Sequence, residues 1–357
     1  MKLFSLFTTS LAIMFLLMAC QPNEKSDVVT IDATNHDFTD WNSIFEIVDT
    51  IPLQQTAQSL VSFPEAMILC DDGFVLADAK SKKIMKFALN GKFLYSTGEL
   101  GRANDEYIRP LDICLSSDKK QFVLLDETGL MYYDLQNGKF QNKEKIFEKY
   151  KYWNKTFIDT NGNIFGFQPF EENTIVCKKT DGKVLSLRPY KCRQFVTRKF
   201  YIYNNVVHVL PDWGDYTIDE FEGDILKTKY YIDFGRDAVP TDWKPTTLDE
   251  FHEKDGKGKY FRTITEACES DNFLLAIVIG PEQKGYNILY NKKTKKSYVG
   301  NGLKSCCHQI IGVHGEDFYF LVYPHMINED NQIYDYWKRL VEQGNENPIV
   351  VKVQIKG

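Results

Sequence analysis

The residues best suited to chemistry are acids, aromatics and one arginine, gathered in three segments that we expect to be loops. They are Arg102, Glu106 and Tyr107, then Asp212, Trp213, Asp215 and Tyr216, and then Trp243. An aromatic ring offers a flat apolar surface and a carboxylate accepts hydroxyl or amide hydrogens, which suits sugar or peptide binding. Two carboxylates at a set separation could instead act as general acid and base on a glycan. Both hypotheses stay open on the sequence alone.

Other catalytic signals are missing. The chain has no nucleophile elbow, HExxH, Walker loop or GxGxxG after a strand, so we expect no cofactor. Cys306, Cys307 and His308 are adjacent, and neighbouring strand residues point to opposite faces, so we expect no metal site there. The DTNGN run from Asp159 resembles the start of a calcium loop, but Ile164 occupies the position of the required glycine. That run is better interpreted as a turn.

The N-terminus carries a targeting signal. One basic residue is followed by an apolar stretch from Leu3 to Met18, which is shorter than the roughly 20 residues of a membrane-spanning helix. Its end, LMAC, resembles a bacterial lipobox, in which the cysteine is lipidated and becomes the first mature residue. We therefore expect a signal peptide over 1–19, a lipid anchor on Cys20 and a polar tether to residue 43. The expected location is the cell envelope at the outer membrane, with the membrane as one partner.

Charge excludes one class of partner. The formal net charge is −6, and the chain has no stripe of lysine and arginine. Such a protein is poorly suited to binding a phosphate backbone, so we expect no nucleic acid partner.

Aromatic residues make up 14% of the chain, and these favour half-buried strands. The composition therefore favours a β-rich protein.

A repeated unit sets the architecture. The segment DDGFVLAD, residues 71–78, joins a tight turn to a short apolar strand, and similar units recur along the chain. Their register marks are Phe74, Phe122, Ile164, Val206, Phe273 and Phe318, at steps of 48, 42, 42, 67 and 45 residues. A period in the forties with several strands per unit is typical of β-propeller blades. The long fourth step indicates an insertion.

The unit itself resolves into four strands. In the first, residues 65–69, 74–78, 83–89 and 92–98 are expected strands, with Asn90-Gly91 as a hairpin turn. The sixth unit lacks sequence for its outer strand. We expect the N-terminal strand over 44–53 to pair with the terminal strand over 348–356, which closes the ring and removes a free edge.

Three segments carry a family resemblance: ALNGKFLYSTGELGRANDEYIRPLDI, IDTNGNIFGF and NPIVVKVQIK. With them the chain resembles the six-bladed β-propeller lipoproteins of unassigned function that are related to NHL-repeat propellers. In that family the loop after the first blade tends to be G-x-G-P-G-E-Y. Here glycine, Glu106 and Tyr107 match, and the Gly-Pro-Gly core is replaced. The resemblance implies a fold and an envelope location, and no reaction.

We therefore expect an all-β chain, a six-bladed β-propeller of four-stranded blades over 44–357. Small helical insertions are expected at 236–262 and 324–347. The long loops lie on the face that carries the crossings between blades, and loops on a rigid scaffold are where function concentrates. The expected function is non-catalytic binding of a glycan, peptide or envelope protein on that loop face. The alternative is a hydrolase or lyase that uses a pair of loop-face carboxylates.

Overall fold

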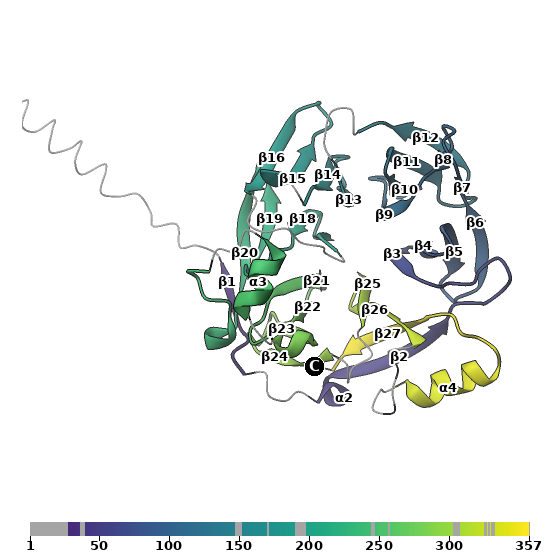
Figure 1. Ribbon diagram of the computed structural model, residues 1–357. Coiled ribbons are helices and arrows are strands. Elements are labelled where there is room, and N and C mark those ends of the chain that lie inside the picture. The colour runs from purple at the N-terminus through teal and green to yellow at the C-terminus, as the bar shows by residue number, and fades with distance from the viewer. Residues whose placement is uncertain are drawn as a thin grey trace, which may run out of the picture.

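The chain forms a closed ring of six antiparallel sheets in a computed structural model (Figure 1). The structure describes residues 28–35, 40–146, 152–169, 171–189, 198–243, 247–255, 258–302, 308–324, 327, 329 and 333–356. The expected signal peptide and Cys20 lie outside the described residues. The all-β, six-bladed prediction is confirmed.

The first two blades follow the sequence repeats closely. The first comprises β3 (Pro64–Cys70), β4 (Gly73–Asp78), β5 (Lys83–Ala88) and β6 (Phe93–Thr97). The crossover to the second contains the short parallel pair β7 (Glu99–Leu100) and β8 (Glu106–Tyr107). The second comprises β9 (Pro110–Leu115), β10 (Gln121–Asp126), β11 (Gly129–Asp134) and β12 (Phe140–Glu144).

The next three blades include one additional strand. The third comprises β13 (Lys155–Ile158), β14 (Ile164–Phe167), β15 (Asn173–Lys178) and β16 (Val184–Pro189). The fourth comprises β17 (Phe200–Tyr203), β18 (Val206–Val209), β19 (Thr217–Glu222) and β20 (Ile225–Asp233). The fifth comprises β21 (Thr263–Glu269), β22 (Phe273–Ile279), β23 (Gly285–Asn291) and β24 (Ser297–Asn301). From the segment expected to be tether, β1 (Val29–Asp32) pairs in parallel with β20 as a fifth strand of the fourth sheet.

The last blade closes the ring as expected. It contains β25 (Gln309–His314), β26 (Asp317–Val322), β27 (Ile349–Ile355) and the N-terminal β2 (Phe45–Pro52). The pairing of β2 with β27 is antiparallel, from Phe45 opposite Ile355 to Pro52 opposite Ile349. Both expected insertions contain a helix. The helices are α2 (Trp41–Ile44), α3 (Leu248–Asp255) and α4 (Tyr334–Glu342), with the 3-10 turns η1 (Gly235–Asp237) and η2 (Pro281–Gln283).

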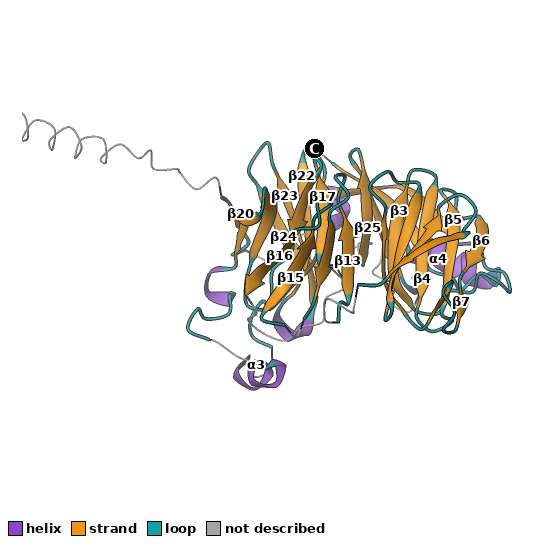
Figure 2. Ribbon diagram, turned by 90° about the horizontal axis from the view of Figure 1, so that it is seen from above, coloured by secondary structure: helices purple, strands orange, loops and turns teal. Residues whose placement is uncertain are grey.

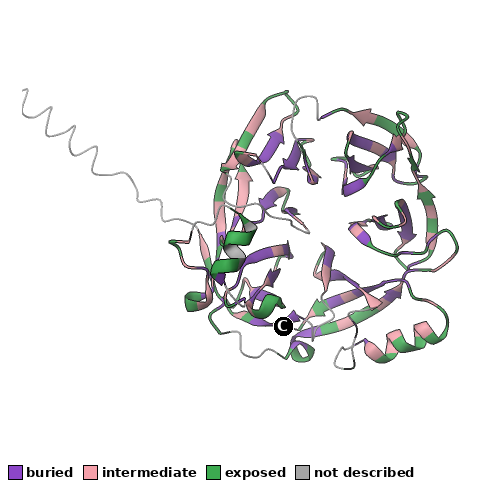
Figure 3. Ribbon diagram, in the orientation of Figure 1, coloured by how far each residue is buried: buried purple, intermediate pink, exposed green. Residues whose placement is uncertain are grey.

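Each interface between neighbouring blades holds its own hydrophobic cluster. Along β4, Phe74 and Leu76 pack towards the sixth blade, whereas Val75 and Ala77 pack towards the second. A strand with period-two side chains can be apolar throughout only when both of its faces are covered. This explains the recurring run FVLAD, and Figure 3 shows buried residues concentrated in the inner part of each blade.

Register marks in two blades need a correction. Phe74, Phe122 and Phe318 face the preceding blade. In the fourth and fifth blades, Val207 and Leu274 take that place, one residue after the marks Val206 and Phe273. A shift of one residue exchanges the faces of a strand, so the marks locate all six blades, but in these two blades the mark lies on the other face of its strand.

A buried aspartate at the end of the second strand fixes each of the first two crossovers. Asp78 accepts hydrogen bonds from the backbone N–H groups of Ser62 and Phe63, at 2.6 and 2.7 Å. Asp126 does the same for Ile108 and Arg109, at 2.9 and 2.8 Å. Both carboxylates are fully buried. Each one therefore ties the chain entering an inner strand to the strand beside it.

The two faces of the ring differ in character. Short turns that join first to second strands lie on one face, the turn face. The crossings between blades and α3 lie on the opposite one, the loop face (Figure 2). The loop face is thus the more irregular of the two.

Thr247 is the N-cap of α3. Its hydroxyl accepts from the Glu250 N–H at 3.1 Å.

Replacing Asp126 tests whether this buried aspartate stabilises the crossover into the second blade. Asp126→Ala leaves the N–H groups of Ile108, Arg109 and Thr128 without their acceptor. Because bonds to a charged group contribute about 1.5–3 kcal/mol each, we expect the free energy of unfolding to fall by about 3 kcal/mol or more in urea denaturation. The control is Asp71→Ala, whose side chain is 84% exposed and should change stability little. Equal losses of unfolding free energy in the two variants would contradict this role of Asp126.

Candidate functional site

The first group of nominated residues lies in the crossover between the first and second blades. Tyr107 is fully buried and its hydroxyl donates to the Lys82 carbonyl, so it is part of the core. Glu106 is half-buried, and its Oε2 accepts from the Ala103 N–H at 2.7 Å. Arg102 is exposed. Of these three side chains, Arg102 is the one that a partner can reach freely.

The second group surrounds the connection from β18 to β19. Asp212 is buried and its carboxylate lies 2.7 Å from the Lys199 ammonium. Burial lowers the pKa of Lys199 to about 8, although Asp212 opposes that shift. Tyr216 is also buried, donating to the Phe261 carbonyl at 2.6 Å and accepting from the Val239 N–H at 2.7 Å. Asp212 and Tyr216 are therefore engaged inside the protein.

The remaining nominated residues are more accessible. The half-buried Asp215 caps its own turn, accepting from the Thr217 N–H at 3.1 Å. Trp213 and Trp243 are half-buried. The Trp243 ring packs edge-on against the Tyr260 ring, with 5.2 Å between the ring centroids. This group belongs to the fourth blade and the insertion that follows it, whereas Arg102 belongs to the segment between β7 and β8, two strands that lie across the ring from β18 and β19 (Figure 1). The structure does not bring the two groups together.

A separate pocket occupies the central channel of the ring. Its volume is about 320 Å³, and all six inner strands line it. The residues at its exposed end follow those strands onto the turn face: Asp71, Ser117, Lys119, Thr160 and His314. The pocket therefore opens on the face opposite to the nominated loops.

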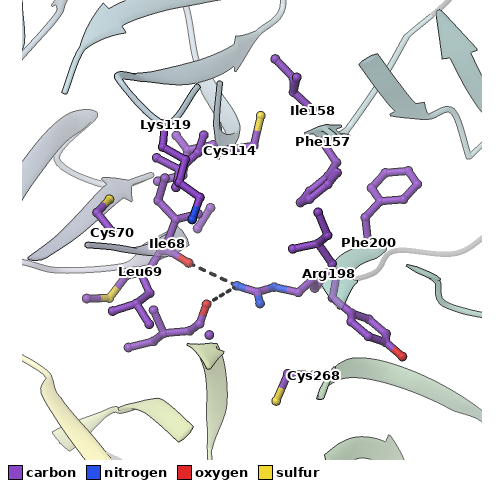
Figure 4. A pocket seen from close by; sticks show the side chains of 18 of the residues that line it. Ile68, Leu69, Cys70, Cys114, Lys119, Phe157, Ile158, Arg198, Phe200 and Cys268 are labelled. Atoms are coloured by element: carbon purple, nitrogen blue, oxygen red, sulfur yellow. Dashed lines mark hydrogen bonds between the residues drawn. The ribbon is translucent and has the colours of Figure 1, made fainter. Parts of the chain in front are cut away.

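The wall of the pocket is largely apolar. Leu69, Phe157, Ile158, Phe200 and Val313 contribute to it, some of which are labelled in Figure 4. Apolar walls with a few polar groups are typical of small-molecule sites, which usually hold 300–1,000 Å³.

Three thiols also line the pocket: Cys70, Cys114 and Cys268. Burial raises the pKa of the Cys70 thiol to about 12 and raises that of the other two as well. A protonated thiol is a poor nucleophile and a poor metal ligand, so these cysteines act as small apolar groups. Among the described residues they form no disulfide, and no cluster of three potential metal-ligating side chains occurs.

Arg198 crosses the channel at the end of the pocket remote from the mouth. It precedes β17 in the fourth blade, and its Nη2 donates to the carbonyls of Met67 and Ile311 at 3.3 and 2.9 Å (Figure 4). Those carbonyls belong to the first and sixth blades, on the far side of the channel. One guanidinium thus spans the channel and forms a polar floor.

Two buried acids stand at the same level. The Asp112 carboxylate accepts from the Thr156 N–H at 2.8 Å, so β9 is joined to the inner strand of the next blade. Glu266 does the same from β21, accepting from the Ile310 N–H. Burial raises the pKa of both carboxyls, that of Glu266 to about 7, and Arg198 opposes each shift. Lys155 lies 3.9 Å from Asp112.

Charged groups elsewhere in the wall are neutralised within the protein. Glu269 accepts from the Tyr201 and Tyr230 hydroxyls at 2.6 and 2.9 Å and pairs with Lys292 at 2.5 Å. Lys199 is paired with Asp212. Asp159 is used in its own turn, accepting from the Asn163 N–H at 2.8 Å, which supports the interpretation of that run as a turn.

Family comparison covers nearly all of the ring. A family model described as a domain of unknown function, DUF4934, matches residues 27–353. The chain belongs to the DUF4934 family. No curated protein matches the sequence significantly. In the described part of this DUF4934 protein, no helix is long and apolar enough to cross a membrane.

Two solved structures share the propeller fold. A candidate exported protein of Bacteroides fragilis NCTC 9343 has a TM-score of 0.70 at 14% identity, over 92% of this chain and 100% of its own. A member of the DUF4221 family from Bacteroides vulgatus ATCC 8482 has a TM-score of 0.57 at 12% identity, over 88% of this chain and 99% of its own. At such identities the similarity concerns the fold.

Sequence reasoning missed the channel. Charged residues within otherwise apolar inner strands were the available signal, namely Asp112 in PLDICL and Glu266 in TITEACE. A charge in such a strand is costly unless it is paired, so each of these residues marks a special environment, and Asp112 lines the pocket.

Glu266 supplies a pH test. Its folded-state pKa of about 7 lies above the ordinary 4.5, so between these values the folded chain keeps a proton that the unfolded chain has lost. This contribution to stability is present below pH 4.5 and is lost as the pH rises towards 7, by about 3 kcal/mol in total. Glu266→Gln keeps an acceptor for Ile310 and cannot titrate. From pH 4.5 to 8, we therefore expect its unfolding free energy to gain about 3 kcal/mol relative to wild type.

The measurement is urea denaturation across this pH range. Glu99→Gln, at an exposed position, controls for the loss of one negative charge. A constant difference between Glu266→Gln and wild type at all pH values would show that Glu266 does not titrate in this window.

Proposed function

We propose that this DUF4934 protein is a non-catalytic, lipid-anchored binding protein of the cell envelope that takes a small molecule into its central channel. The observation that carries the proposal is the channel pocket, with its apolar wall, mouth on the turn face and polar floor at Arg198. A preformed concave site of this composition is suited to partly apolar ligands. This replaces the loop face as the preferred position for a small ligand.

Support for the location comes from the N-terminal sequence. An apolar stretch too short to span a bilayer ends in LMAC at Cys20, as in bacterial lipoproteins. The B. fragilis protein of the same fold is itself described as a candidate exported protein. Both agree with an envelope protein, and we place its lipid anchor at the outer membrane.

Support for binding over hydrolysis comes from the nominated acids. An acid and base pair needs two accessible carboxylates close together. Asp212 is buried against Lys199, Asp215 caps its own turn, and Glu106 is held by the Ala103 N–H in a different part of the ring. The hydrolase alternative therefore has little support in this arrangement.

The loop face favours a second candidate, a protein partner. Phe63, Ile108 and Tyr152 are exposed by 60, 38 and 43% where the chain enters three consecutive inner strands. Exposed apolar residues at equivalent positions of neighbouring blades are suited to an interaction surface. Arg102, Trp213, Asp215 and Trp243 lie on the same face and could contribute polar and aromatic contacts.

Thermal unfolding against a ligand panel tests the channel. The panel holds glycans, peptidoglycan fragments, peptides and small amphiphiles, and a ligand at 100 times its dissociation constant adds about 2.7 kcal/mol to stability. Leu69→Trp should obstruct the channel and abolish the shift. The control is Leu94→Trp, a 45% exposed residue on an outer strand, which should leave the shift intact. A shift that Leu69→Trp preserves would move the site elsewhere, and no shift from any ligand would favour the protein partner.

Changing Cys20 to serine tests the anchor. Cys20→Ser removes the sulfur that would carry lipid. In cells grown with radiolabelled palmitate, we expect the wild-type protein to be labelled and the variant to be unlabelled. When the cell extract is partitioned with detergent, we expect the variant to move from the detergent phase to the aqueous phase. Cys70→Ser, a buried core thiol, controls for general loss of a cysteine. Label that persists in Cys20→Ser would contradict lipidation at this site.

A further inference from the structure

We propose that the channel ligand is a single-headed amphiphile with a carboxylate, whose head group is bound by Arg198 and whose apolar chain lies along the channel wall. The inference rests on the proposed function, because it names the class of molecule that the channel takes. It depends on three observations: the donors that Arg198 has left, the charges around it, and the wall above it.

Arg198 has donors to spare. A guanidinium carries five N–H groups in a planar fork that matches a carboxylate. Nη2 is used by the carbonyls of Met67 and Ile311. Within the described part of the chain, Nε and Nη1 make no hydrogen bond, and the side chain is only half-buried. Three N–H groups therefore remain for a ligand at the floor of the pocket.

The partners of Arg198 also matter. It bonds to two neutral carbonyls, and no carboxylate of the described residues lies within ion-pair distance of it. The acids at this level have other partners, since Asp112 lies beside Lys155 and accepts from Thr156, and Glu65 lies 4.0 Å from Lys155. Glu266 accepts from Ile310, and its raised pKa lets it hold a proton near neutral pH. The guanidinium keeps its charge, so an anion is the complementary ligand.

The wall fixes the rest of the ligand. Between the floor at Met67 and the mouth at Asp71 the inner strand advances four residues, about 13 Å at 3.3 Å per residue. Leu69, Phe157 and Phe200 contribute apolar surface to this space, and Lys119 lies at its exposed end (Figure 4). A carboxylate head at the floor and an apolar chain of medium length along the wall match these two parts of the pocket. A sugar would leave its hydroxyls without partners along this wall.

Calorimetric titration with three molecules of equal chain length provides the test: octanoate, octanol and octylamine. With the wild-type protein we expect octanoate to bind at least tenfold more tightly than the other two. Arg198→Met should weaken octanoate binding by about 10- to 100-fold, because it removes charge-assisted hydrogen bonds, and should change octanol binding by less than threefold. Arg339→Met makes the same change at an exposed position on α4 and should alter neither.

Folding of each variant is checked by its thermal unfolding without ligand. Arg198→Lys, which keeps the charge but loses the fork, should give intermediate octanoate affinity and serves if Arg198→Met does not fold. The carboxylate inference is overturned if octanol binds as tightly as octanoate. It is also overturned if Arg198→Met weakens the binding of both molecules equally. Either result leaves the channel as a binding site. If Leu69→Trp leaves the affinities for all three molecules unchanged, the channel is not their binding site. Failure of all three to bind overturns the inference, and the wider panel then decides whether the channel binds anything else.

Discussion

A four-stranded blade cannot cover its own two faces, and the rest of this structure follows from that constraint. The second strand of nearly every blade is apolar on both sides, so each blade needs a neighbour on its left and on its right. Only a closed ring supplies two neighbours to all six. The pairing of β2 with β27 is what closes it, joining the first and last strands of the ring.

Closure has a cost at the centre. The inner strands present unpaired backbone groups to the channel, because no sheet continues beyond them. Side chains meet part of that need: Asp112 and Glu266 each accept from the inner strand of the next blade, and Arg198 donates to two blades opposite. The polar floor of the pocket is thus also a structural device. Two of the charged groups that hold the inner strands in place, Asp112 and Arg198, line the pocket, so a ligand in the channel would meet them.

The sequence predicts the fold well because the fold is repeated. Turn dipeptides followed by apolar runs, seen six times, identify blades even where a single strand would be ambiguous, and the missing outer strand pointed to β2. Register is less secure, as Val206 and Phe273 show, because one residue exchanges the two faces and both are apolar. Site prediction fails for a different reason. Tyr107, Asp212 and Tyr216 look like loop residues in sequence but are buried, and Arg198 acquires its meaning only when three distant strands converge on it.

The parallel pairing of β1 with β20 gives the ring a mechanical order. A pull on the N-terminal end of the chain reaches Val29–Asp32 before it reaches β2, so tension is first carried by a four-residue strand at the outer edge of the fourth blade. That strand adds to a sheet that is already complete without it. Releasing that strand would leave the β2–β27 pairing untouched but would expose Ile31, which is fully buried in the hydrophobic cluster between the fourth and fifth blades.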